Sequence, residues 1–131
     1  MLVREHMSTP AVTVRTDSDY NTALRLMDEN ALHHLPVVDG GGALVGIAAE
    51  RDLLLAATRY LGAAIEVGEV MHRGVVTAAP EMPIAKAADL MVRNRIGGLP
   101  VVDGGGQLMG IITEADIFRA LVAELRQTHH A

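Results

Sequence analysis

The sequence has no cysteine, no tryptophan and very few aromatic residues. Aromatic side chains make up 2% of its 131 residues, as Tyr20, Tyr60 and Phe118. The lack of cysteine excludes a disulfide framework, a thiolate nucleophile and zinc sites with sulfur ligands. With so few aromatic rings available, the core must be built from aliphatic side chains and methionine.

Positive charge is also scarce. Eleven Lys and Arg residues stand against sixteen Asp and Glu residues, for a net charge of -5 at pH 7. A protein with this balance repels phosphate backbones over most of its surface and has few aromatic rings to stack on bases. We therefore do not expect nucleic acid as a partner.

Long hydrophobic runs are missing as well. The longest apolar stretch, residues 53–65, is interrupted by polar residues at 58–60, and Arg4 and Glu5 stand where a signal peptide would need apolar residues. Neither stretch fits a membrane span or a secretion signal. We expect a cytoplasmic protein without a membrane partner.

An internal duplication dominates what the sequence does contain. A shift of 64 positions aligns residues 3–56 with residues 67–120 without a gap, and 23 of the 54 aligned pairs are identical. The longest identical run is Leu-Pro-Val-Val-Asp-Gly-Gly-Gly, at 35–42 and 99–106. Such a density indicates two structural copies. We assign residues 1–62 to the first repeat, 63–124 to the second and 125–131 to a C-terminal tail.

Each repeat is predicted to fold as β-α-β-β-α, which is a mixed α/β (α+β) fold. In the first copy, residues 11–14 favour a strand, and apolar residues at helical spacing follow between 23 and 31. Strands at 35–38 and 44–48 flank a glycine-rich hairpin, and a second helix begins near Glu50. That helix is expected to bury Leu53, Leu54 and Ala57.

A single repeat of this size is marginally stable alone. The two copies are therefore expected to pack against each other about a pseudo-twofold axis, which leaves two related clefts.

Standard catalytic and phosphate-binding motifs are not found. The glycine-rich hairpin is followed by Ile47 and Ala48, where a phosphate-binding loop needs Lys and then Ser or Thr. The only serines, Ser8 and Ser18, do not lie in a nucleophile motif, and the six histidines include no H-E-x-x-H. The sequence predicts neither an enzyme nor a metal site.

Two interpretations remain open for Gly-Ile-Ile-Thr-Glu-Ala-Asp at residues 110–116. Thr113 and Asp116 have the spacing of a capping box, which would do no more than start a helix. Alternatively, the same helix start binds a ligand. The Asp116 carboxylate would then accept two charge-assisted hydrogen bonds from a ribose diol, while the Thr113 hydroxyl and free N–H groups meet a phosphate.

These features together resemble a known family. The paired Leu-Pro-Val-Val-Asp segments, the glycine-rich hairpin and the G-h-x-[TS]-x-x-D pattern at 110–116 are similar to those of a tandem pair of CBS domains, also called a Bateman module. The resemblance runs from Val3 to about Ala120.

The resemblance implies roles for particular residues. It implies that Asp116 binds the ribose hydroxyls of an adenosine ligand, that Thr113 lies near the ribose and phosphate, and that His34 of the opposite repeat meets the phosphates. The residues that would lie against adenine are Val75, Val76, Ile96 and Ile111.

The first copy departs from this pattern. It keeps Asp52, but Ala49 replaces the hydroxyl residue, and Gly98 stands at the basic position that would serve this copy from the other repeat. We expect one competent adenosine site at Asp116 and a weaker second cleft at Asp52.

The expected function is regulatory. The resemblance implies a module that binds AMP, ADP or ATP, with NADH and S-adenosylmethionine as further candidates and no catalytic cofactor. It would sense energy or metabolite levels through the conformation of a homodimer or through an unidentified effector protein. The alternative is a ligand-free dimerisation scaffold with degenerate clefts.

Overall fold

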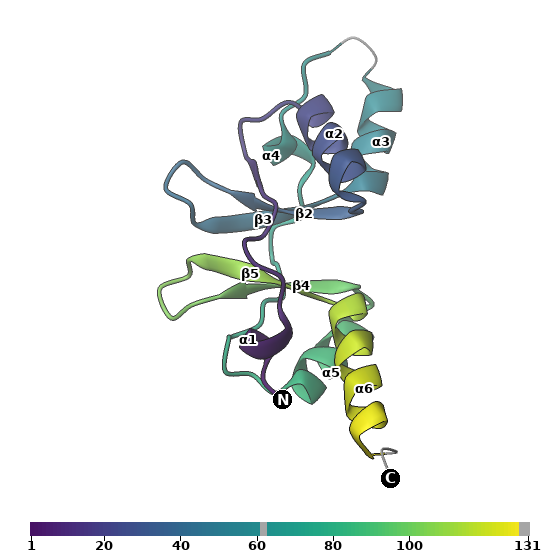
Figure 1. Ribbon diagram of the computed structural model, residues 1–131. Coiled ribbons are helices and arrows are strands. Elements are labelled where there is room, and N and C mark those ends of the chain that lie inside the picture. The colour runs from purple at the N-terminus through teal and green to yellow at the C-terminus, as the bar shows by residue number, and fades with distance from the viewer. Residues whose placement is uncertain (61–62, 129–131) are drawn as a thin grey trace. The chain divides into compact units, whose positions relative to one another are not determined.

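The computed structural model describes residues 1–60 and 63–128, and it divides into two compact units (Figure 1). One, the central unit, comprises residues 12–75; the other, the split unit, joins Met1–Ala11 to residues 76–128. Each unit therefore takes a short leading segment from the other repeat. The repeat boundary proposed at 62/63 follows the duplication in the sequence. The compact units of the structure instead meet at residues 11/12 and 75/76.

The central unit contains a three-stranded sheet with three helices. In this sheet the strand order is β1-β2-β3, with β1 parallel to β2 and β2 antiparallel to β3. Its elements are β1 (Val14–Arg15), α2 (Tyr20–Asn30), β2 (His34–Val38), β3 (Leu44–Ala49), α3 (Glu50–Arg59) and α4 (Val67–Val70).

The split unit repeats this arrangement with one difference. Its antiparallel pair β4–β5 has the same register shift as β2–β3, but the first strand is reduced to an isolated parallel bridge between Ala78 and Val101. Its elements are α1 (Val3–His6), α5 (Ile84–Asn94), β4 (Gly98–Val102), β5 (Leu108–Thr113) and α6 (Glu114–Thr128).

The two hairpins are fixed by the same side-chain chemistry. The Asp39 carboxylate accepts hydrogen bonds from the backbone N–H groups of Gly41 and Ala43, at 2.9 and 3.0 Å. Gly42 has a φ of 85°, which glycine adopts without a steric penalty. Asp103 and Gly106 repeat the arrangement in the split unit. These contacts confirm the predicted hairpins.

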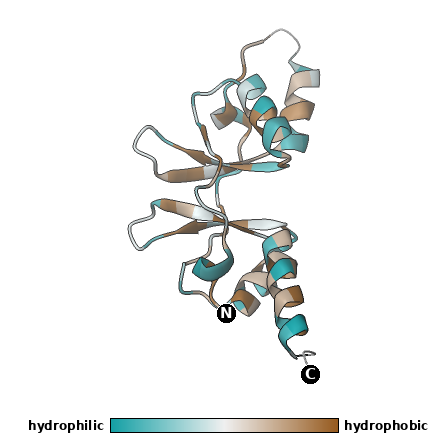
Figure 2. Ribbon diagram, viewed as in Figure 1, coloured by the Kyte–Doolittle hydropathy of each residue, from teal (hydrophilic) through white to brown (hydrophobic). Residues whose placement is uncertain are grey.

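Each unit has its own aliphatic core, made from equivalent positions of the two repeats. Leu35, Val37 and Ala48 are buried in the central unit, as Leu99, Val101 and Ile112 are in the split unit. Apolar residues along the helices alternate with polar ones, as Figure 2 shows. The leading segments add Val67 to the central core and Val3 to the split core. The mixed α+β fold with two repeats is therefore confirmed.

Two details differ from the sequence-based expectation. Helix α3 buries Leu53 and Ala56, while Leu54 is 49% exposed, so its expected burial was wrong. The cause is helical phase, since Leu54 lies about 100° around the helix from Leu53. Helix α6 continues through Thr128, so residues 125–128 of the proposed tail are helical; the rest of that tail lies outside the described residues.

Candidate functional site

Asp116 lies in the first turn of α6 and is held from several directions. Within residues 1–60 and 63–128, it is the only charged residue that is buried, at 4% exposed. Its Oδ2 accepts hydrogen bonds from the Thr113 backbone N–H and hydroxyl, at 2.9 and 3.0 Å. In return, the Asp116 N–H donates to Thr113 Oγ1 at 3.3 Å. The capping box predicted from the sequence is therefore confirmed.

The other carboxylate oxygen of Asp116 meets two exchangeable donors. Oδ1 accepts from the Arg119 guanidinium at 2.5 Å and from the Ser8 hydroxyl at 3.3 Å. The Arg119 side chain is 70% exposed and Ser8 lies at the surface. The Thr113 contacts, by contrast, are fixed by the helix start. Oδ1 is thus the oxygen whose donors come from exposed side chains.

Asp52 holds the equivalent position at the start of α3 but has different surroundings. Its side chain is 33% exposed, and its Oδ2 lies 2.6 Å from Nε2 of His72. Ala49, at the N-cap of α3, has no side chain that could donate or accept a hydrogen bond. The Asp52 site therefore lacks the hydroxyl that Thr113 supplies to Asp116.

Two further histidines lie close to this end of α3. Nδ1 of His33 is 3.3 Å from Oε1 of Glu50. His34 begins β2, pairs with Ala49 in the sheet and faces solvent with part of its ring. Partial desolvation lowers the pKa of His34, and the neighbouring His33 lowers it further, against the opposite effect of Asp52 and Glu50. The neutral imidazole is therefore favoured.

We expect this lowered pKa to make stability pH-dependent. The neutral form of His34 is favoured in the fold, so its contribution is full above the ordinary pKa of 6.5 and is lost as pH falls below that value. Urea unfolding at pH 7.5 and pH 5.5 should show a larger loss of stability for the wild type than for His34→Gln. Equal losses in the two proteins would contradict the role of His34.

The apolar residues predicted to lie against adenine fall in both units. Val76, Ile96 and Ile111 are half-buried in the split unit, which also contains Thr113 and Asp116. Val75 and His34 belong to the central unit. The site that these residues would form together stays a prediction.

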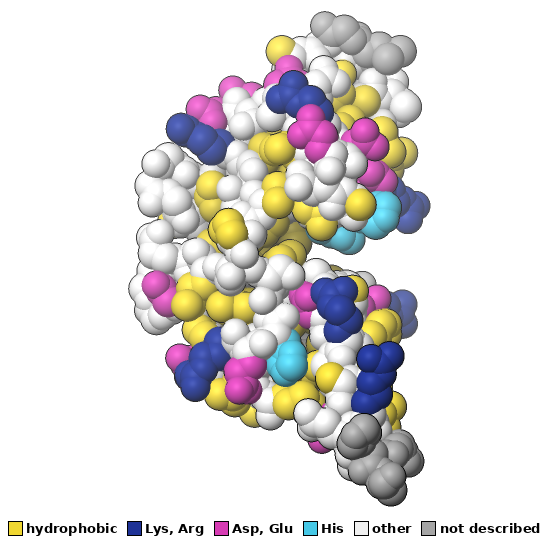
Figure 3. Space-filling model, viewed as in Figure 1, with side chains coloured by type: hydrophobic (Ala, Val, Ile, Leu, Met, Phe, Trp, Pro, Cys, Tyr) yellow, Lys and Arg dark blue, Asp and Glu magenta, His cyan; other side chains and the backbone are white. Residues whose placement is uncertain are grey.

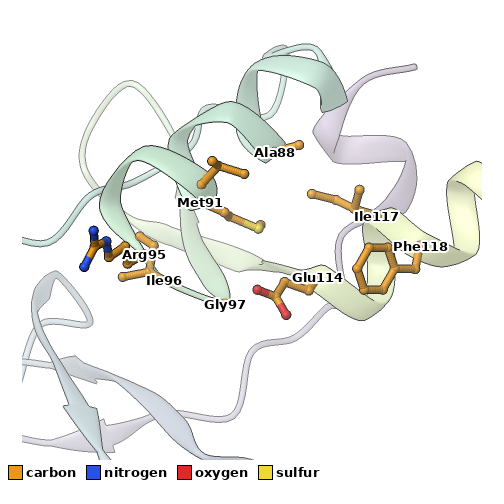
Figure 4. Close-up of a pocket in the computed structure, with 9 residues that line it drawn as sticks. Ala88, Met91, Arg95, Ile96, Gly97, Glu114, Ile117 and Phe118 are labelled. Carbon is orange, nitrogen blue, oxygen red and sulfur yellow. The ribbon is translucent and has the colours of Figure 1, made fainter.

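Ile96 lines a groove of about 370 Å³ between α5 and α6 (Figure 4). Met91 and Ile117 point into it from the two helices, and Gly97 and Glu114 lie at one end. In the central unit, the position equivalent to Gly97 is His33, which contacts Glu50. The glycine leaves this end of the groove open beside the Glu114 carboxylate.

Three residues near the two carboxylates were missed by the sequence interpretation: Ser8, His72 and Arg119. Arg119 lies three residues after Asp116, a spacing at which side chains on a helix meet, so it was open to prediction. Ser8 is 108 residues from Asp116 and reaches it only because the leading segment packs on the split unit. No local pattern indicates that contact.

The distribution of charge and of metal-binding side chains does not indicate a further functional site among the described residues. Side chains of both signs are interspersed on the face of the molecule shown in Figure 3. In the part of the chain that the structure describes, no three His, Asp or Glu side chains are grouped to hold a metal ion. Nor does any helix among residues 1–60 and 63–128 have the length and apolar character to cross a membrane.

Known proteins with the same repeat provide a comparison. A CBS domain-containing protein of Dictyostelium discoideum is 35% identical over 136 residues, which cover 95% of this chain and 94% of the relative. Other relatives are enzymes of which the matched region makes up 21 to 24%. In those enzymes the similarity is confined to a small part of a longer chain.

Two solved structures share the fold and contain adenosine compounds. The CBS domain pair of protein MJ0100 was crystallised with 5′-methylthioadenosine and S-adenosyl-L-methionine; it is 31% identical, with a TM-score of 0.84, and the match covers 95% of this chain and 98% of that one. CBSX2 was crystallised with AMP and is 28% identical, with a TM-score of 0.85 and the same coverage.

The family itself is identified by the sequence of each repeat. The CBS domain matches this chain twice, at residues 3–59 and 67–123. These segments contain both hairpins and both signature aspartates. The chain therefore belongs to the CBS domain family and carries two copies of the domain in tandem.

Proposed function

We propose that this protein is a regulatory module that binds an adenosine nucleotide of the AMP, ADP or ATP type at Asp116. The observation that carries the proposal is the buried carboxylate itself, which Thr113 holds through Oδ2 and which Ser8 and Arg119 contact through Oδ1. Two CBS pairs of similar structure were crystallised with adenosine compounds, which supports this ligand class.

The chemistry of the site suits a nucleoside. A ribose diol would replace Ser8 and Arg119 as donors to Asp116, so the buried charge would keep its hydrogen bonds. The guanidinium released from Asp116 would be free to meet a phosphate, for which arginine is well suited. Val76, Ile96 and Ile111 supply apolar surface for the base in the same unit.

Regulation requires that the ligand distinguish two conformations. A nucleotide that bound both states equally would change nothing, however tightly it bound. We propose that the output passes through a homodimer or through an effector protein. Helix α6 offers a surface for such contacts, since Phe118, Leu121, Val122 and Leu125 are exposed at helical spacing.

Calorimetric titration tests the proposal directly. AMP, ADP, ATP, NADH and S-adenosylmethionine should be titrated separately into the full chain, and we expect saturable binding of at least one adenosine nucleotide. Guanosine monophosphate serves as the control, because it presents the same ribose and phosphate with a different base. No heat from any adenosine compound at millimolar concentration would contradict the proposal.

A ligand-free dimerisation scaffold is the second candidate function. It is favoured by the fact that both oxygens of the Asp116 carboxylate already accept hydrogen bonds within the split unit. In that case Thr113 and Asp116 act only as a helix cap. The same titration separates the two candidates, because a scaffold binds none of the compounds while remaining folded.

A further inference from the structure

Ser8 and His72 occupy equivalent places in the two units. They are 64 positions apart, as are Asp116 and Asp52. Ser8 exchanges backbone hydrogen bonds with Ile111 at 2.8 and 3.1 Å, and His72 exchanges the same bonds with Ile47 at 2.9 Å each. In both cases a leading segment crosses the last strand and brings one side chain to the signature aspartate.

The contacts of these two side chains with their aspartates differ in length and in donor type. The Ser8 hydroxyl lies 3.3 Å from Asp116 Oδ1, a long contact between a neutral donor and a carboxylate. Nε2 of His72 lies 2.6 Å from Asp52 Oδ2, within the range of a strong hydrogen bond to a charged acceptor. Among the described residues, His72 is the only side chain with a hydrogen bond or ion pair to the Asp52 carboxylate.

This contact occupies one oxygen of the Asp52 carboxylate. A cis-diol donates two hydrogen bonds, so it needs two accepting positions on the carboxylate. At Asp116 a diol would displace the Ser8 hydroxyl and the Arg119 guanidinium, which lies 2.5 Å from Oδ1. At Asp52 it would displace the imidazole of His72, which lies 2.6 Å from Oδ2. The bridge to Ile47 fixes the backbone of His72, and the ring, 66% exposed, lies against Asp52.

We propose that His72 competes with ribose for the Asp52 carboxylate and is a specificity-determining residue that makes the two sites unequal. This inference rests on the proposed function at Asp116 and adds a third difference to those at Ala49 and Gly98. The ligand class excluded from the central unit is any nucleoside with a free cis-diol. Restoring that site requires two changes, Ala49→Thr and His72→Ser, which introduce the residues that the split unit carries.

Calorimetry with AMP tests the inference in chains where Asp116 is replaced by asparagine. We expect Asp116→Asn alone to show no binding and Asp116→Asn with Ala49→Thr to show little. Adding His72→Ser should strengthen AMP binding by about tenfold over that double variant. Equal affinity with and without His72→Ser would overturn the inference.

A second readout needs no nucleotide. Carbodiimide coupling of glycine ethyl ester labels accessible carboxylates, and mass spectrometry gives the extent for each residue. We expect His72→Ser to raise labelling of Asp52 severalfold, while His72→Gln, which keeps a donor, leaves it near the wild-type level. Glu50 on the same helix is the internal control, because its partner His33 is unchanged.

The two readouts separate the possible failures. If no chain binds AMP, the wild type included, the proposed function at Asp116 fails while the labelling of Asp52 still decides whether His72 covers it. If the wild type binds AMP but labelling of Asp52 is the same in His72→Ser, the competing role is wrong. Thermal melting of each variant checks that it is folded.

Discussion

Replacing Asp116 by asparagine is expected to abolish AMP binding in the wild-type background. The substitution keeps the size of the side chain but removes the charge that would accept both ribose hydroxyls. Hydrogen bonds to a charged group contribute about 1.5–3 kcal/mol each, so losing two weakens binding by at least about 100-fold. Isothermal titration calorimetry measures this loss.

Asp52→Asn is the matched control for that experiment. Asp52 stands at the same position of the other repeat, but its carboxylate is paired with His72 and lacks a neighbouring hydroxyl. We expect its replacement to change AMP affinity by less than about threefold. Equal losses from the two substitutions would show that both sites bind and would contradict the unequal roles.

Gly110→Ala is expected to destabilise the split unit strongly. A Cβ at this position would lie 2.6 Å from the Ser8 carbonyl oxygen and 2.8 Å from Cγ2 of Thr9. The oxygen belongs to backbone that is bonded to Ile111 on β5, so the leading segment must move away as a whole. Overpacking of this kind costs about 3 kcal/mol, which urea unfolding measures.

Gly104→Ala provides the comparison, because it makes the same chemical change in open space. Nothing lies within 4 Å of a Cβ built there, and the backbone is not in the left-handed region. The free energy of unfolding should change by less than about 0.5 kcal/mol. If Gly110→Ala proved equally harmless, the packing of the leading segment on β5 would be incorrect.

The hairpins and the helix starts were open to prediction because their chemistry is local. Asp39 and the three glycines after it form the turn with a hydrogen bond inside the turn. Thr113 and Asp116, three residues apart, hydrogen-bond to each other. A short first strand was predicted at residues 11–14, but it lies at Val14–Arg15. In the second repeat it becomes one bridge at Ala78, since strand pairing depends on the neighbour as well as on the segment itself.

Contacts between segments far apart in the chain could not be predicted from the sequence pattern. The hydrophobic spacing around Leu53 does not fix the exact phase of the helix, so Leu54 was placed inside although it is exposed. The contacts of Ser8 with Asp116 and of His72 with Asp52 depend on how each leading segment crosses the following sheet. The two carboxylates could be identified from the sequence, whereas the side chains that hydrogen-bond to them are known only from the structure.

The leading segments also make the two halves of this chain interdependent. A cut at the repeat boundary would take Val3 out of the split core and Val67 out of the central core, although both side chains are completely buried. Each half would then lack a side chain that fills its hydrophobic core.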